Sequence, residues 1–242
     1  MTLKFAPYSY SKISTFKSCP LKFKFQYIDK IPGMMDTAAL IKGRTIHYLI
    51  ENSNLTEIEY SDEMKQNIRD YPEAVQIKNN FEQSELGIKY LKNIDKASIN
   101  EYKLGLSLTL SATEYSRESL FNGIVDYICV KSGVLYICDF KSGKYRDNRF
   151  QDYNQLLFYA IHFFEKYKIP KIIISFIYVE HNLENDLELK IEYLDNYKIE
   201  LLTSIKEIET CADFKPNISK LCDYCGFQEI CVANLSNKLL SI

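Results

Sequence analysis

The chain has 242 residues and a formal net charge of −2, with 46% hydrophobic and 26% charged residues. These values are ordinary for a folded soluble protein with one substantial core, so we expect a single domain over residues 1–242. The sequence has no uncharged apolar run of about 18 residues, so we expect no membrane span, and the first twelve residues lack the apolar stretch of a signal peptide, so we do not expect secretion.

The first half of the chain is predicted to be largely helical. A short helix over 9–27 begins with hydroxyl and aromatic residues and is interrupted at Pro20. A helix over 38–52 places Gly43, His47 and Glu51 on one face, because they recur every four positions. Residues 53–100 are helical and acidic without a turn-rich linker, and we interpret them as a helical insertion. A strand over 101–110 follows.

The second half alternates strands with helices. Two strands over 121–131 and 134–141 are separated by Ser132-Gly133, a two-residue hairpin turn. The remaining predicted elements before a cysteine-rich tail are a helix over 152–168, strands over 171–179 and 187–193, and a helix over 195–211. A strand, a helix and a strand in succession imply a parallel crossover. The predicted fold class is therefore α/β, a mixed central β-sheet flanked by helices.

The hairpin turn brings two acids together. With a two-residue turn at 132–133, Asp126 lies directly opposite Asp139, and Lys141 projects from the same face. Facing aspartates repel each other, and a divalent cation held by both removes that repulsion. Mg²⁺ takes one or two carboxylates together with waters and phosphate oxygens, and an adjacent lysine can stabilise a pentavalent phosphate. The competing interpretation is a surface ion-pair cluster of these three residues.

Two further features favour the metal site. Gln155 and Tyr159 share one face of the helix that follows the hairpin. His47 offers an imidazole, which suits Mn²⁺ better than Mg²⁺.

Four motifs then occur in the order typical of one family: Gly43-x-x-x-His47-x-x-x-Glu51, Gly123-Ile124-Val125-Asp126, Asp139-Phe140-Lys141-Ser142-Gly143 and Gln155-x-x-x-Tyr159. In these motifs the chain resembles the RecB-like branch of the PD-(D/E)XK nuclease superfamily. That branch includes the nuclease domains of RecBCD and AddAB helicase–nucleases, phage exonucleases and CRISPR-associated adaptation nucleases. The resemblance spans most of the chain, with residues 53–100 as the exception.

The resemblance implies a restriction-endonuclease-like core and a set of site residues. It implies Mg²⁺ or Mn²⁺ bound by His47, Asp126, Asp139 and the carbonyl of Phe140. It further implies a catalytic set made of Asp126, Asp139 and Lys141, supported by Gln155 and Tyr159.

Seven cysteines form an odd number, which fits poorly with paired disulfides and favours metal binding. Cys222, Cys225 and Cys231 form C-x₂-C-x₅-C, and Cys19 is a fourth candidate about 200 residues earlier. Such thiolates need a soft metal, and the spacing alone favours zinc over an iron–sulfur cluster. The resemblance reverses that order, because a cysteine in F-x-x-C-P combined with the C-terminal triplet is similar to the arrangement that holds a [4Fe–4S] cluster in AddB-type and CRISPR-associated members. It implies a cluster that joins residues 1–30 to residues 215–235.

Positive charge gathers in two segments of this near-neutral chain. Residues 1–30 hold six lysines against one aspartate, and 141–149 add four cations against one aspartate. This asymmetry predicts a positive track for DNA, the alternative being solvated helix faces. Aromatic and basic residues suit base stacking and phosphate contacts. The predicted DNA-binding residues are Tyr10, Lys12, Lys144 and Arg146.

Together these features predict a metal-dependent exonuclease that acts at DNA ends, with single-stranded DNA favoured, in recombination, repair, phage DNA processing or CRISPR spacer acquisition. The expected location is the cytoplasm of a bacterial, archaeal or phage-infected cell. Because the sequence has no G-x₄-G-K-[ST] phosphate loop, a helicase or a recombination or CRISPR-adaptation protein would be a separate partner. Two interpretations compete: a non-catalytic DNA-binding or assembly subunit that keeps the fold and the cluster, and a zinc-ribbon protein.

Overall fold

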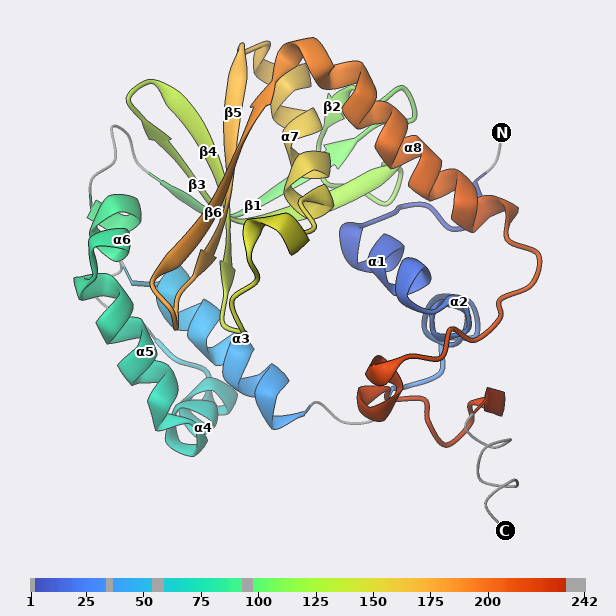
Figure 1. Ribbon diagram of the computed structural model, residues 1–242, viewed down its shortest axis with the longest axis horizontal. Helices are drawn as coiled ribbons and strands as arrows, with labels where there is room; N and C mark the ends of the chain where they lie inside the picture. The colour runs from blue at the N-terminus through green and yellow to red at the C-terminus, as the bar shows by residue number, and fades with distance from the viewer. Residues whose placement is uncertain (1–2, 34–36, 54–58, 93–97, 234–242) are drawn as a thin grey trace.

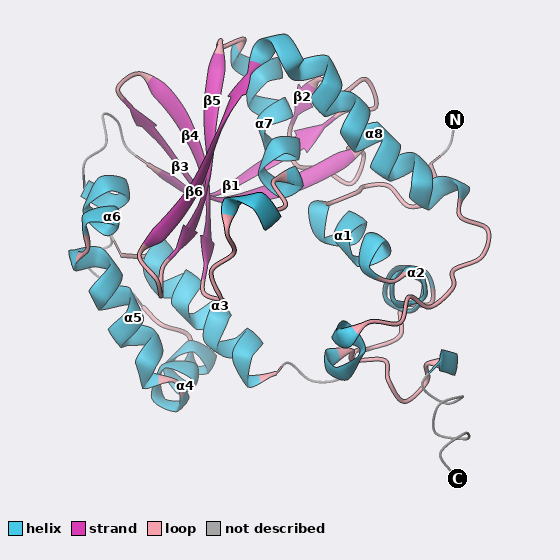
Figure 2. Cartoon of the chain, in the orientation of Figure 1, coloured by secondary structure: helices cyan, strands magenta, loops and turns pink. Residues whose placement is uncertain are grey.

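A six-stranded sheet with helices on both faces forms the centre of the computed structural model, which describes residues 3–33, 37–53, 59–92 and 98–233 (Figures 1 and 2). The strands are β1 (Ile99–Leu106), β2 (Ala112–Thr113), β3 (Phe121–Lys131), β4 (Val134–Lys141), β5 (Lys171–Tyr178) and β6 (Leu183–Lys190). Their order is β2-β1-β3-β4-β5-β6, with β4 and β5 parallel and the other neighbours antiparallel. The predicted mixed α/β fold is confirmed, and α7 (Asn154–Tyr167) is the expected crossover between the parallel strands.

One face of the sheet is covered by α7 together with α1 (Tyr10–Ser18) and α8 (Leu194–Thr210) (Figure 1). The middle of α7 is apolar around its circumference because it lies between the sheet and α8, and Phe158, Ile161 and Phe164 have no exposed surface. The chain ahead of α1 joins this face as well. Tyr8 donates its N–H to the Leu120 carbonyl at 2.7 Å and its hydroxyl to the Glu209 carboxylate at 2.5 Å, which ties the N-terminal segment to the end of α8.

The opposite face is covered by the helices of the first half of the chain. They are α3 (Ala38–Glu51), α4 (Asp62–Asp70), α5 (Pro72–Gln83), α6 (Glu85–Gly87) and a π-helical turn, η2 (Ile88–Lys92). Hydroxyl caps begin three of them, since the side chains of Thr37, Ser61 and Ser84 accept backbone N–H bonds at the starts of α3, α4 and α6. Cys129 and Cys138 are buried under these helices.

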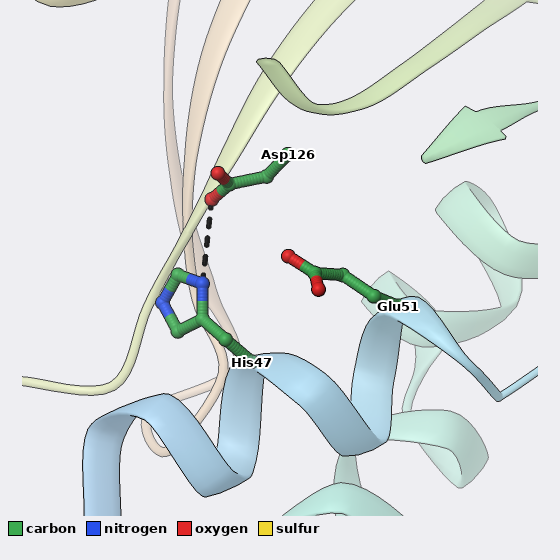
Figure 3. A group of neighbouring side chains, drawn as sticks. All are labelled: His47, Glu51 and Asp126. Carbon is green, nitrogen blue, oxygen red and sulfur yellow. Dashed lines mark ion pairs between the residues drawn. The ribbon is translucent and has the colours of Figure 1, made fainter. Parts of the chain in front are cut away.

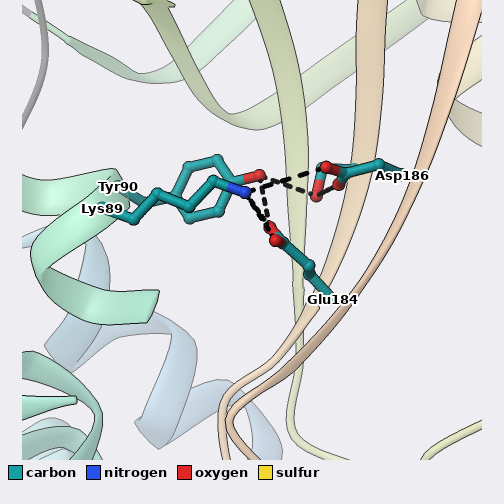
Figure 4. A network of polar contacts seen from close by, with 5 residues as sticks. Lys89, Tyr90, Glu184 and Asp186 are labelled. Atoms are coloured by element: carbon teal, nitrogen blue, oxygen red, sulfur yellow. Dashed lines mark hydrogen bonds and ion pairs between the residues drawn. The ribbon is translucent and has the colours of Figure 1, made fainter. Parts of the chain in front are cut away.

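The segment predicted as a helical insertion is mostly helical where it is described, but its end was wrong because Ile99 and Asn100 belong to β1; residues 54–58 and 93–97 lie outside the described ranges. We call residues 60–92 the cap. A polar network fixes its last turn to β5 and the edge strand β6 (Figure 4). Lys89 Nζ lies 2.5 Å from Glu184 Oε1, and the Tyr90 hydroxyl donates to Glu184 Oε2 at 2.8 Å. Asp186 accepts from Ser175 Oγ at 2.5 Å and lies 3.8 Å from Lys89.

The cap also contacts the middle of the sheet directly. The Tyr127 hydroxyl donates to the backbone carbonyl of Tyr90. The Phe81 ring packs edge-on against Phe140, with centroids 6.0 Å apart, and Tyr127 and Phe140 pack on each other at 5.7 Å. The cap therefore shares a hydrophobic core with the central hairpin rather than projecting into solvent.

Several predicted element boundaries were wrong. The first strand covers Ile99–Leu106 rather than 101–110, because residues 107–111 close a tight turn in which Leu110 has a φ of 60°. The last strand covers Leu183–Lys190 rather than 187–193, since its pairing with β5 starts straight after a turn with Asn182 at a φ of 50°. The helix over 9–27 is divided at Pro20 as predicted, into α1, α2 (Pro20–Phe23) and the π-helical turn η1 (Lys24–Ile28). Within the described ranges, every helix is too short or too polar to cross a lipid bilayer.

Candidate active site

The β3–β4 hairpin has the predicted register. Ser132 and Gly133 both have positive φ, 49° and 72°, as a two-residue turn of this kind requires, and Tyr127 pairs with Cys138. Asp126 and Asp139 would be the next pair of this register, but the backbone pairing of β3 with β4 ends at Tyr127 and Cys138. The Phe140 N–H instead donates to Asp126 Oδ2 at 3.0 Å. The two acids therefore stand where the strands separate.

The opposite neighbour of β3 is irregular at the same level. Glu101 has a φ of 49°, which is uncommon for a residue with a side chain, and the pairing of β1 with β3 passes from Asn100↔Tyr127 to Tyr102↔Val125 without including it. Strict alternation places Val125 on the face of Tyr127, yet Val125 packs in the core on the other face. The strand thus changes direction at Asp126.

Three side chains converge on one point beside this break (Figure 3). α3 supplies His47 and Glu51, one turn apart, and β3 supplies Asp126. One ligand atom from each lies within 4.8 Å of the other two, and His47 Nδ1 is 3.4 Å from Asp126 Oδ2. The site is unbalanced in charge. Burial and then the charge of Asp139 raise the pKa of Asp126, while burial and then Glu101 and Asp139 raise the pKa of Glu51 to about 7.

These donors suit a divalent cation. A cation at this point neutralises the acids, and imidazole with carboxylate is a donor set for Mn²⁺ and related metals. Burial lowers the pKa of His47, which keeps its ring neutral and able to act as a ligand. The ring also hydrogen-bonds to the backbone of Phe140, whose carbonyl is one of the predicted ligands.

Asp139 has different partners from Asp126. It is 3% exposed, and its Oδ2 lies 2.5 Å from Lys141 Nζ. Gln155 donates from Nε2 to Asp139 Oδ1 at 2.5 Å and accepts from Lys141 Nζ at 3.3 Å. The structure therefore brings together all three predicted catalytic residues and Gln155. Asp139 itself lies outside the group formed by His47, Glu51 and Asp126.

Two motif glycines are explained by close packing in the site. A Cβ on Gly123 would lie 2.5 Å from Cε1 of Tyr159, so the ring of Tyr159 occupies the space above this glycine. A Cβ on Gly43 would lie 3.0 Å from Oγ of Ser142, so α3 sits directly on the end of β4. Tyr159 is 7% exposed and hydrogen-bonds to Gln155, which makes it a support for that side chain.

A cavity of about 500 Å³ lies above the triad. It is lined by His47 and Glu51 and also by Arg44, Tyr48 and Glu101. From the sequence, Glu51 was placed on the same helix face as His47 but was not predicted to be a metal ligand. Its i, i+4 spacing from His47 is the feature that could have indicated this role. Nothing in the sequence indicated that Glu101 lines the cavity, because a residue with a positive φ inside a strand does not change the hydrophobic periodicity of the sequence.

The predicted DNA-binding residues have different environments. The Tyr10 hydroxyl donates to Asp152 Oδ2 at 3.0 Å, at the edge of the site. The ammonium of Lys12 donates to the carbonyls of Phe5 and Pro7, so it points into the N-terminal segment. Lys144 and Arg146 are exposed on the loop that leaves Lys141.

The four cysteines that were predicted to act together line one cavity of about 280 Å³: Cys19, Cys222, Cys225 and Cys231. Cys211 is not among its lining residues. The N–H of Asn217 donates to Cys19 Sγ at 3.4 Å and the N–H of Ser219 donates to Cys222 Sγ at 3.5 Å. Across the described ranges no three cysteine sulfurs lie within 4.8 Å of one another. The four cysteines thus share a cavity, but their sulfurs are not clustered as the ligands of one ion would be.

A sequence model of the PD-(D/E)XK nuclease superfamily matches residues 7–232. No curated protein matches the chain. Among solved structures, that of a protein named SSO0001 is similar with a TM-score of 0.41 and 14% identity, over 92% of this chain and 85% of the other.

Proposed function

Because this chain belongs to the PD-(D/E)XK nuclease superfamily, we propose that it is a divalent-metal-dependent deoxyribonuclease of the RecB-like branch that hydrolyses DNA from its ends and favours single strands. The observation that carries the proposal is the convergence of His47, Glu51 and Asp126 on one point, with the paired Asp139 and Lys141 alongside. A subunit without catalysis has no need for a lysine and an amide both held on a buried carboxylate.

The residues of the site have separate roles. His47, Glu51 and Asp126 would hold Mg²⁺ or Mn²⁺, and Asp139 and the Phe140 carbonyl would complete the set. Such a cation supplies Lewis acidity toward the phosphate and lowers the pKa of a bound water.

Around that set the protein positions positive charge. Lys141 presents its ammonium where negative charge grows on the phosphate oxygens in the transition state. Gln155 holds Lys141 and Asp139 in fixed orientations, and Tyr159 packed on Gly123 holds Gln155.

We further propose that Cys19, Cys222, Cys225 and Cys231 hold a [4Fe–4S] cluster. Their shared cavity and the N–H groups that point at two of the sulfurs support a common bound group, and the family resemblance of the cysteine pattern favours a cluster over zinc. Its role is structural. Linking Cys19 to Cys222 closes a loop of about 200 residues, which stabilises the fold by about 5 kcal/mol in the chain-entropy model. With that link, residues 1–242 form one domain.

A cleavage time course tests the nuclease. Single- and double-stranded DNA labelled at the 5′ or the 3′ end is incubated with Mg²⁺, Mn²⁺ or EDTA. We expect metal-dependent release of label, faster from single strands, and loss of activity in Asp126→Asn but not in the exposed control Asp195→Asn. Metal-loaded wild-type protein that binds DNA without cutting it would instead support the assembly-subunit alternative.

Colour and melting test the cluster. Anaerobically purified protein should be brown, and Cys225→Ala should lose both the colour and thermal stability while the control Cys211→Ala keeps both. A colourless wild type that contains stoichiometric zinc would refute the cluster proposal and leave the nuclease proposal intact.

A further inference from the structure

One phenylalanine in the loop between two site residues, Lys141 and Gln155, is exposed to water. Phe150 is 73% exposed, the highest value for a phenylalanine in the described ranges. It ends a 3₁₀ turn, η3 (Asn148–Phe150), in the loop of residues 142–150. In Figure 1 this turn lies between the end of β4 and the start of α7. Lys141 therefore precedes the loop, and Gln155, which contacts Asp139, follows it.

The exposure of Phe150 is not a consequence of a loose loop. Asp147 caps η3 and pairs with Arg149, whose Nε lies 2.8 Å from its Oδ1. Asn148 accepts from the Tyr153 hydroxyl at 2.7 Å, and Gln151 accepts from the Tyr178 hydroxyl at 2.5 Å.

The front of the loop is fixed to β6. Tyr145 donates to Asn185 Oδ1 at 3.1 Å, and Asn185 donates back to the Arg146 carbonyl at 2.7 Å. Hydrogen bonds on both sides of Phe150 thus hold an apolar ring in water, a position that the hydrophobic effect disfavours.

The loop that carries the ring is rich in cations. The Arg149 guanidinium lies 5.6 Å from the Phe150 ring centroid, and Lys144 and Arg146 are exposed on the same loop. The one acid of this loop, Asp147, is already paired with Arg149. An aromatic face among cations is the composition of sites that stack an unpaired base while binding the adjoining phosphates.

We propose that Phe150 is a stacking platform for an unpaired nucleobase next to the phosphodiester bond that is cut, with Lys144, Arg146 and Arg149 on the flanking phosphates. The inference rests on the proposed deoxyribonuclease function and names the form of its substrate. Inside a duplex both faces of every base are already stacked, so the platform accepts only a single strand or a frayed end. Phe150 is thereby a specificity-determining residue that favours ends over internal sites.

Binding measured without cleavage tests this. Fluorescein-labelled single-stranded oligonucleotides are titrated in EDTA with wild type, Phe150→Ala, Phe150→Tyr and, as a matched exposed apolar control, Leu108→Ala. Loss of one stacked base weakens binding about 5- to 100-fold, so Phe150→Ala should show a loss in this range. Phe150→Tyr and Leu108→Ala should stay near the wild-type affinity. A relaxed, covalently closed circular duplex, which offers neither unpaired bases nor ends, should bind all four proteins alike.

An abasic scan shows whether a base is the partner. At one position, removing the base should weaken binding to the wild type but not further weaken binding to Phe150→Ala. Equal losses for both proteins at every position, or wild-type affinity in Phe150→Ala, would overturn the proposal. Because these measurements use no metal, a wild type that binds as described yet never cleaves would contradict the nuclease function and not the platform.

Discussion

Adding a single methyl group to the site, in Gly123→Ala, tests how tightly it is packed. The new Cβ would lie 2.5 and 2.7 Å from Cε1 and Cδ1 of Tyr159 and 3.1 Å from Cδ1 of Leu104. Ordinary contacts need at least 3.4 Å, so the Tyr159 ring has to shift by about 1 Å. Overpacking of this kind costs about 1–3 kcal/mol. For a chain of this size that is a fall in Tm of about 2–12 °C.

The same shift has a functional consequence. Tyr159 hydrogen-bonds to Gln155, and Gln155 holds both Asp139 and Lys141. A displacement of about 1 Å in a positioning group costs about 100-fold in rate. We therefore expect kcat to fall far more than KM rises.

Thermal melts in EDTA and single-turnover cleavage measure the two effects. Gly143→Ala is the matched control, because a Cβ at Gly143 meets nothing within 4 Å. In a Tyr159→Ala background the added methyl has room, so the cost of Gly123→Ala should largely disappear. An equal cost in both backgrounds, or a cost no greater than that of Gly143→Ala, would refute the packing argument.

Three further outcomes are expected. Between pH 4.5 and about 7 the metal-free protein should lose stability as pH rises, because the raised pKa of Glu51 means that the folded state keeps a proton that the unfolded chain releases at lower pH. Melts in EDTA measure this, Glu51→Gln should flatten the profile, and Mn²⁺ should restore stability above that range. Lys141→Ala should abolish cleavage and lower the free energy of unfolding by about 3 kcal/mol in EDTA, because it leaves a buried carboxylate unpaired; wild-type cleavage would contradict the assigned role. Tyr90→Phe should cost about 1–2 kcal/mol in urea unfolding and raise the Mn²⁺ concentration needed for activity, whereas Tyr224→Phe, on an exposed ring, should do neither.

The turn residues correctly predicted the register of the hairpin, but they did not predict the geometry at its open end, where β3 and β4 separate. Ser132-Gly133 fixes the register through its two positive φ angles, so the meeting of Asp126 and Asp139 followed from the sequence. The separate partners of the two acids did not, because the ladder ends one step early and the Phe140 N–H turns to a side chain. That event depends on α3 and β1, which are distant in the sequence.

The orientation of individual side chains could not be predicted from the sequence either. Lys12 was predicted to face DNA because of its neighbours, yet its ammonium binds backbone carbonyls within its own segment. The extra acid Glu101 enters the cavity only because its backbone is left-handed. The four cysteines predicted to hold one group line a common cavity, but no three of their sulfurs lie within 4.8 Å of one another, so a shared group stays a prediction.

The contacts between the cap and the hairpin bear on how this molecule opens. Tyr127 and Phe140 are each next to a site aspartate in the sequence. Both contact the cap, Tyr127 through a hydrogen bond to Tyr90 and Phe140 through ring packing with Phe81. If the cap separates from the sheet, water reaches both aromatic residues. The two aspartates beside them then lose their fixed positions together. Backbone amides of the cap and of these two strand ends should then exchange hydrogen at one common rate, as a single cooperative unit.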